Sequence, residues 1–233
     1  TNMNLNEVIA NRANEILGKK LGDNNPIHPN DHCNLGQSSN DSFPTAMNIA
    51  IILEIKKNLI PTIKKFSKEL SVKEKSFSEI VKIGRTHLQD AVPLTLGQEF
   101  GAFKVQVDNA LYRIKESSKE LFALAQGATA VGSGLNSSTV FVTGFIKAIQ
   151  SITNLPFKSS ENKFESLSSH DSIVNLSGAL NTLVTASYKI ANDIRLLSSG
   201  PRCGIGEINI PSNEPGSSIT VSYTHLTLAT MFE

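Results

Sequence analysis

Hydroxyl, amide and imidazole side chains gather in a few polar stretches of the sequence, and these are the candidates for chemistry. Ser38, Ser39 and Asn40 stand just before a predicted helix start. Hydroxyls, an amide and unpaired backbone N–H groups at that position favour the binding of an anion. The alternative is that the cluster only caps the helix, a common role for Ser and Asn.

A second stretch carries Thr86 and His87 at the mouth of a long predicted helix. Histidine titrates near neutral pH and therefore suits proton transfer, although a lone histidine is more often structural. His28 and His32 have the spacing of a zinc-binding helix, but Pro29 argues against a helix and no third ligand is evident. We therefore expect no metal site.

Two further stretches are rich in glycine. Residues 127–138 resemble a phosphate loop, but no strand precedes them and no Lys-Ser/Thr pair follows, so we reject nucleotide binding. Residues 199–219 end in Ser217 and Ser218, two hydroxyls on a predicted mobile loop. By itself this stretch is typical of a linker.

The hydrophobic pattern predicts helices almost throughout. We expect a helix over 4–17, a loop over 18–41, and an apolar helix that is capped by Ser42 and kinked or broken at Pro61. A short extended piece follows, and then a loop over 84–99. Long helices are predicted over 96–126 and 171–199, the latter with Asp171 as its N-cap.

Both long helices carry an apolar seam whose spacing alternates between three and four residues, which is typical of near-parallel bundle packing. Val174, Val184, Tyr188 and Ala191 add a second stripe to the later helix, so we expect it to contact partners on two sides. The predicted fold class is an all-α, elongated and oligomeric helical bundle. The two seams consist of Phe100, Phe103, Val107, Ala110, Ile114, Ser117, Leu121 and Leu124, and of Ile173, Leu176, Leu180, Leu183, Ser187, Ile190, Ile194 and Leu197.

The composition excludes several classes of protein. The 233 residues include 22 Lys and Arg against 21 Asp and Glu, a net charge of +1 that argues against nucleic-acid or membrane-surface binding. No apolar run approaches the length of a membrane span. Cys33 and Cys203 are too few and too far apart for a disulfide scaffold, and they suit a reducing compartment.

Six separated motifs together resemble the class II fumarate hydratases of the fumarase/aspartase superfamily, over about residues 1–219. Three features favour the hydratases over the aspartases: His87, where aspartases typically have Gln, Ser39, where they typically have Thr, and the string NEPGSSI. The motifs, in the order of that family, are TNMNLNEVIANRA, HPNDHCNLGQSSNDSFPTAMNIA, GRTHLQDAVPLTLGQEF, GSGLN, FESLSSHDSIVNLSGAL and SGPRCGIGEI with NEPGSSI.

The resemblance implies anti addition of water to fumarate, giving L-malate, without a cofactor. It implies a homotetramer in which three subunits contribute to each site. By motif match, His87 and Ser217 are the catalytic residues, with Ser217 as the base. The same match assigns fumarate binding to Ser38, Ser39, Asn40, Thr86 and Ser218, and a secondary dicarboxylate site to His28, Pro29, Asn30 and Asp31.

The sequence departs from the family at both ends. The SGT substrate segment is not present before Thr1, and Tyr223 and His225 stand where the family's MPGKVNP has its Lys and Asn. The string VSYTHLTL resembles a translated sequencing adapter, so we expect residues 220–233 to be a non-family tail. The expected domains are 1–38, the end of the N-terminal lyase domain, 39–219, a partial central bundle, and 220–233.

Two alternatives remain open: another lyase of the superfamily, such as aspartate ammonia-lyase, and a catalytically dead helical oligomer. We expect this truncated chain to be inactive alone, because cationic and amide contacts to substrate are lost. The expected location is the cytoplasm, or the mitochondrial matrix in a eukaryote.

Overall fold

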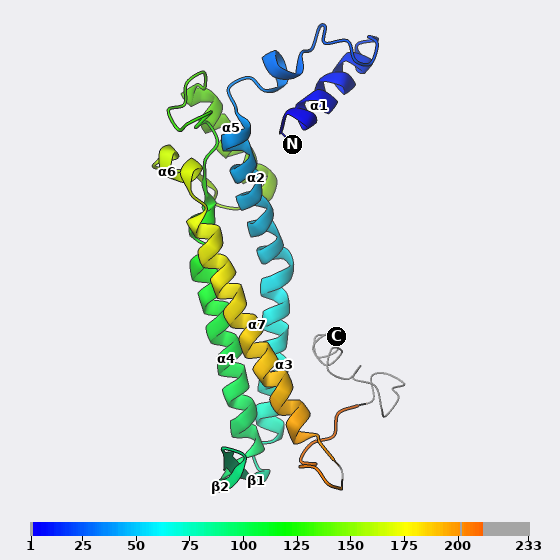
Figure 1. The fold of residues 1–233 in the computed structure, drawn as a ribbon, viewed down its shortest axis with the longest axis vertical. Helices are drawn as coiled ribbons and strands as arrows, with labels where there is room; N and C mark the ends of the chain where they lie inside the picture. The colour runs from blue at the N-terminus through cyan, green and yellow to red at the C-terminus, as the bar shows by residue number, and fades with distance from the viewer. Residues whose placement is uncertain (1, 201, 212–233) are drawn as a thin grey trace. The chain divides into compact units, whose positions relative to one another are not determined.

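The computed structural model describes residues 2–200 and 202–211 and is predominantly helical (Figure 1), as expected of an all-α protein. Its chain forms two compact units. One comprises residues 1–55 and 118–175, and the other comprises residues 56–117 and 176–233. These units do not follow the three segments expected from the sequence, whose boundaries remain a prediction.

The first unit contains short helices and one small sheet. Strands β3 (Ala123–Leu124) and β4 (Lys158–Ser159) pair in parallel. The helical elements of this unit are α1 (Asn2–Ile16), η1 (Pro29–Cys33), α2 (Ser39–Glu54), η3 (Glu120–Phe122), α5 (Thr139–Thr153), α6 (Lys163–Ser168) and the start of α7 (Asp171–Leu197).

Buried amides of α1 hold the polar stretch that follows it. Asn14 is 1% exposed, and its side chain bonds the backbone oxygens of Asp23 and Ile27 at 2.6 and 2.8 Å and the N–H of Ile27 at 2.9 Å. Asn6 Nδ2 donates to Asn34 Oδ1 at 3.0 Å. Side-chain hydrogen bonds therefore order a stretch that has little regular structure, apart from the π-helical turn η1.

The start of α2 corrects the predicted cap. Ser38, not Ser42, is the N-cap, and Asp41 completes a capping box with it. Pro44 consequently lies inside the helix rather than in its first turn. At Pro61, the α-helical geometry is interrupted but the helical path is not: π-helical η2 (Ile55–Leu59) stands between α2 and α3 (Ile60–Ser76), and the proline lies in the first turn of α3, where it needs no N–H partner.

The core of the second unit lies between α3 and α4 (Leu96–Ser117). Phe100 lies edge-on to Phe77, with ring centroids 5.2 Å apart, and the α4 seam is buried from Phe100 to Ser117. The predicted helix over 96–126 ends nine residues early, since Leu121 lies in η3 and Leu124 in β3. Both are fully buried there. The apolar pattern therefore extends past the end of the helix because the residues after it are also buried.

The later helix, α7, matches the predicted span 171–199 closely. Leu176, Ile190 and Leu197 of its seam are buried, and Asp171 is its first residue rather than its cap. In the second stripe, Val174, Val184 and Tyr188 are 69%, 62% and 62% exposed, while Ala191 is buried. The described residues thus cover only one face of this helix.

A β-hairpin replaces the loop expected over 84–99. Strands β1 (Val81–Thr86) and β2 (Gln89–Thr95) pair antiparallel, with an irregularity at Gly84. A Cβ on Gly84 would lie 2.6 Å from the Val92 oxygen, which explains the glycine. Thr95 and Gln98 then exchange side-chain-to-backbone hydrogen bonds that start α4.

Candidate functional site

The N-terminus of α2 presents the first group of candidates. Ser38 is extended, and its Oγ accepts a hydrogen bond from the Asn40 N–H at 3.2 Å. Asp41 Oδ1 accepts the Ser38 N–H in return at 2.9 Å. Ser38 therefore has the capping role that was its alternative interpretation, whereas Ser39 and Asn40 are exposed at the helix start.

Asp41 joins this helix start to the glycine-rich loop of residues 127–134. Its carboxylate is fully buried, and Oδ2 accepts the N–H groups of Gly127 and Thr129 at 3.0 and 2.9 Å. Asn40 Nδ2 donates to the Ala130 oxygen at 2.8 Å. The loop rejected as a phosphate binder is thus a structural wall beside Ser39 and Asn40.

A pocket of about 450 Å³ opens beside these residues in the first unit. Its polar lining includes Ser39, Asn40, Ser168 and His170, and its apolar lining includes Phe43 and Phe164. Hydroxyl, amide and imidazole donors around such a space match the needs of a small carboxylate ligand.

Sequence reasoning missed Asp41 as a residue that shapes this site. The signal was present: Ser38 and Asp41 have the spacing of a capping box directly before an apolar run. Reading it would have placed the helix start correctly. The hydrogen bonds from the distant glycine-rich loop had no such signal.

Thr86 and His87 lie at the tip of the β1–β2 hairpin, in the second unit. Thr86 ends β1, while His87 and Leu88 form the turn with φ of 52° and 62°. Positive φ at both central positions is the geometry of a tight two-residue hairpin turn. The His87 side chain is exposed and has no hydrogen bond or ion pair with any described residue. This exposure disfavours the structural alternative for the histidine.

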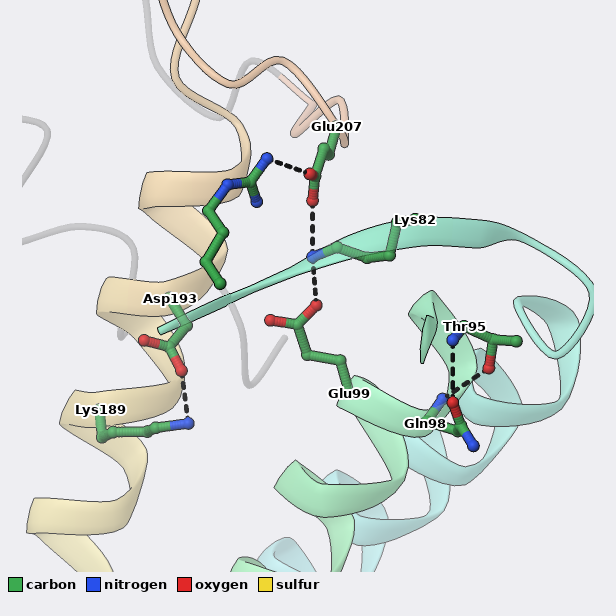
Figure 2. A network of polar contacts seen from close by, with 8 residues as sticks. Lys82, Thr95, Gln98, Glu99, Lys189, Asp193 and Glu207 are labelled. Carbon is green, nitrogen blue, oxygen red and sulfur yellow. Dashed lines mark hydrogen bonds and ion pairs between the residues drawn. The ribbon is translucent and has the colours of Figure 1, made fainter. Parts of the chain in front are cut away.

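A cluster of four charged residues supports the base of this hairpin (Figure 2). Lys82 Nζ lies between two carboxylates, 2.5 Å from Glu99 and 2.6 Å from Glu207. Arg85 donates to Glu207 Oε1 at 2.6 Å. No local sequence pattern predicts this cluster, because Arg85 and Glu207 are 122 positions apart.

The opposite charges in the cluster shift the pKa values of Glu207 and Arg85. Burial is the largest single influence on the pKa of Glu207 and acts to raise it, but the interactions with Arg85 and Lys82 together outweigh burial and leave the pKa lowered. The hydrogen bond to Glu207 raises the pKa of Arg85. Glu207 and Arg85 therefore both stay ionised at neutral pH.

The proposed secondary group, His28 to Asp31, lies on the η1 turn. His28 Nδ1 accepts the N–H groups of Asn30 and Asp31 at 3.3 and 3.2 Å, and Pro29 is buried. An accepting Nδ1 places the proton of a neutral imidazole on Nε2, which can then donate to an anion. The described residues contain no group of three or more metal-binding side chains.

Ser217 and Ser218 lie outside the described residues. Ser38, Ser39 and Asn40 share the first unit with their neighbouring loop, and Thr86 and His87 share the second unit with the charged cluster. Within the described residues, no helix is both long and apolar enough to cross a membrane.

Comparison with known proteins assigns the chain to a family. Residues 1–220 match a family model described as a lyase, and the chain belongs to this lyase family. Within it, the chain is similar to the class II fumarate hydratases. It is 58% identical over 219 residues to "Fumarate hydratase class II 2" of Bradyrhizobium diazoefficiens, covering 94% of this chain and 46% of that relative.

Two further matches agree. The mitochondrial fumarate hydratase of Rhizopus oryzae is 55% identical over 94% of this chain and 44% of its own length. The crystal structure of class II fumarase from Schistosoma mansoni superposes with a TM-score of 0.90 at 43% identity, over 94% of this chain and 49% of that one. The chain thus spans about half the length of the relatives that it matches.

Proposed function

We propose that the chain is part of a class II fumarate hydratase, which adds water to fumarate in the anti sense to give L-malate. One observation carries this proposal: the two relatives reported above are 58% and 55% identical to this chain over 219 positions, and both are named fumarate hydratase, one of them as class II. The geometry supports it, because Ser39, Asn40, Thr86 and His87 are exposed and not consumed in the core.

Fumarate is a small dianion, so its site needs hydrogen-bond donors at each carboxylate. The exposed hydroxyl of Ser39, the amide of Asn40 and the hydroxyl of Thr86 supply them, with the α2 N-terminus adding its partial positive charge. Ser38 contributes by fixing this helix start, since its Oγ already accepts a backbone N–H. Ser218 is assigned to substrate by motif match alone.

In the dehydration direction, removal of the proton beside a carboxylate creates an aci-carboxylate with additional negative charge. Donors aimed at that carboxylate before reaction stabilise this charge without reorganising. Ser217 is the proposed base, and His87 transfers the proton of the departing or attacking water. Acid–base chemistry of this kind requires no cofactor.

The partner most consistent with the exposed surfaces is a second copy of this chain, in a homotetramer. The uncovered stripe of α7 includes Val174, Val184 and Tyr188, and no residue of α5 is buried within the chain. Shared sites follow, with several subunits contributing to each. The relatives include bacterial and mitochondrial enzymes, which supports a location in the cytoplasm or the mitochondrial matrix. The secondary dicarboxylate site, His28 to Asp31, belongs to the same proposal.

The test uses a full-length enzyme, here called the restored enzyme. In it, the aligned 219 residues of this chain replace the corresponding segment of the Bradyrhizobium diazoefficiens relative. His87→Asn should lower kcat by about 10²–10⁴-fold with little change in KM, because proton transfer is strengthened only in the transition state. Asn40→Ala should mainly raise KM, because it removes a ground-state contact.

Loss of fumarate absorbance measures both variants. If His87→Asn leaves kcat within about threefold, the histidine is not a proton-transfer group. Turnover of aspartate in place of malate by the unsubstituted restored enzyme would instead support the ammonia-lyase alternative.

A further inference from the structure

The charged cluster at the base of the hairpin has no role in the chemistry proposed above. Its members come from three places: Lys82 and Arg85 from β1, Glu99 from the first turn of α4, and Glu207 from the segment after α7. Figure 2 shows the ammonium of Lys82 between the two carboxylates. The cluster therefore connects three separate elements of the second unit.

Glu207 is its central member. It contacts Lys82 with one oxygen and Arg85 with the other, each at 2.6 Å. The irregularity between Ile83 and Arg85 in the strand register places both cations where one carboxylate can reach them. The side chain of Lys82 is only 9% exposed and that of Glu207 only 18% exposed, so the pair is largely shielded from solvent.

The backbone of Glu207 is anchored independently of these side chains. Its N–H donates to the Leu197 oxygen at the end of α7 at 2.8 Å, and the Gly206 N–H donates to the Ser199 oxygen at 2.6 Å. Gly204 is packed so closely that a Cβ there would lie 2.3 Å from the Ser199 carbonyl carbon. Glu207 thus extends from a fixed turn at the end of α7.

Arg85 is the last residue but one of β1, two positions before His87 in the turn. The last two ladder pairs of the hairpin are Arg85 with Asp90 and Thr86 with Gln89. A displacement of Arg85 therefore also moves the turn that these pairs close. The His87 imidazole forms no hydrogen bond or ion pair with any described residue. Its position therefore depends on the backbone that carries it.

We propose that Glu207 is a positioning residue: by holding Arg85 and Lys82, it fixes the hairpin tip that presents Thr86 and His87 to the substrate. The segment that contains Glu207 also leads to Ser217, ten positions further on. The same carboxylate therefore ties the stretches that precede both proposed proton-transfer groups to one another. This inference rests on the proposed function.

The test is a double-mutant cycle in the restored enzyme. Glu207→Gln keeps the shape of the side chain and removes its charge, and it should lower kcat about 10- to 100-fold, the loss that a small misplacement of a catalytic group causes. KM should rise by a smaller factor than kcat falls, because Thr86 is the one proposed ground-state donor on the hairpin, whereas Ser39 and Asn40 belong to the other unit. In the His87→Asn background, Glu207→Gln should have no further effect on kcat, since the group that it positions is gone.

The matched control is Glu161→Gln. Glu161 is also paired with a lysine, but its side chain is 92% exposed and lies 3.7 Å from Lys158, so kcat should be unchanged. Arg85→Gln approaches the same contact from its other partner and should repeat the non-additivity. It also provides a second variant if Glu207→Gln does not assemble. Equal losses of kcat with and without His87, or a loss below threefold, overturn the proposal.

Hydrogen exchange of the peptide spanning residues 81–95 separates this inference from the proposed function. Exchange should be faster in Glu207→Gln than in Glu161→Gln, because the hairpin loses its support; unchanged exchange overturns positioning whatever the activity. Failure of the proposed function has a different signature: an inactive unsubstituted restored enzyme, or a kcat indifferent to His87→Asn.

Discussion

Two buried polar regions of the chain hold exposed candidate residues in opposite ways. At the start of α2, one carboxylate, that of Asp41, accepts three backbone N–H groups and is fully buried. At the base of the hairpin, Glu207 instead meets two cationic side chains and keeps 18% of its side-chain surface exposed. Both arrangements stabilise a loop or turn, but only the second uses opposite charges.

The two kinds of support should respond differently to salt and to pH. Backbone donors are fixed by the chain and lose little entropy when they bind, whereas Lys and Arg side chains must be ordered and are screened by salt. We therefore expect the support by Asp41 to be insensitive to salt, and the support by the cluster around Glu207 to weaken as salt rises or pH falls. Hydrogen exchange in the restored enzyme measures how strongly each region is stabilised.

The largest expected effect is that of Asp41→Ala. It leaves the N–H groups of Gly127 and Thr129 buried without an acceptor, at about 1–3 kcal/mol each. Protection of both amides should fall by about tenfold or more, since ~1.4 kcal/mol corresponds to a factor of ten. Asp23→Ala, at an exposed aspartate, is the control and should leave these amides unchanged. Unaltered protection in Asp41→Ala would show that the loop does not depend on this carboxylate.

Lowering the pH should have a smaller effect, a loss of hydrogen-exchange protection in the hairpin that the charged cluster supports. The pKa of folded Glu207 is lowered, so its stabilisation is present above the unfolded pKa of about 4.3 and is lost as pH falls through the folded value. Protection of residues 81–95 should decline over that acidic range by about 1–2 kcal/mol, a value between exposed and buried charged contacts. Glu207→Gln should abolish this decline; a decline of equal size in that variant would refute the assignment to Glu207.

Salt provides an independent check on the same contrast. Raising the ionic strength from about 0.1 to about 1 M shortens the Debye length from ~10 to ~3 Å. Exchange over residues 81–95 should then rise by about twofold to fivefold, as expected for a loss of up to ~1 kcal/mol. The amides of Gly127 and Thr129 should not respond, because their acceptor Asp41 has no cationic partner among the described contacts. Equal salt dependence in both regions would remove the distinction between them.

The sequence predicted the long helices better than the polar supports. The alternation of three and four along α4 and α7 is a strong local signal, and both helices begin where it placed them, although α4 ends nine residues early. The hairpin was missed because its turn, His87-Leu88, lacks the Gly or Asn that usually marks positive φ. Asp41 had a capping signal that was readable, whereas the pairing of Arg85 with Glu207 depends on the fold alone.

The smallest expected effect concerns Asp108, whose contacts combine both modes. It accepts from the buried hydroxyl of Ser67 at 2.5 Å and pairs with Lys104, one helical turn earlier, at 2.7 Å. Burial acts to raise its pKa, but these two partners outweigh burial and lower it. Because 41% of the Asp108 side chain is exposed, solvent screens the ion pair.

Asp108→Asn should therefore speed exchange along α3 by no more than about fivefold, equivalent to at most ~1 kcal/mol. Asp193→Asn is the matched control, since Asp193 forms the same type of pair with Lys189. No hydrogen bond between Asp193 and a hydroxyl is present among the described contacts. A larger effect at Asp108 than at Asp193 measures what the bridge to Ser67 adds to an exposed ion pair. Equal effects would mean that the hydroxyl contributes nothing, and that an aspartate needs several fixed donors, as Asp41 has, before it can stabilise a neighbouring segment.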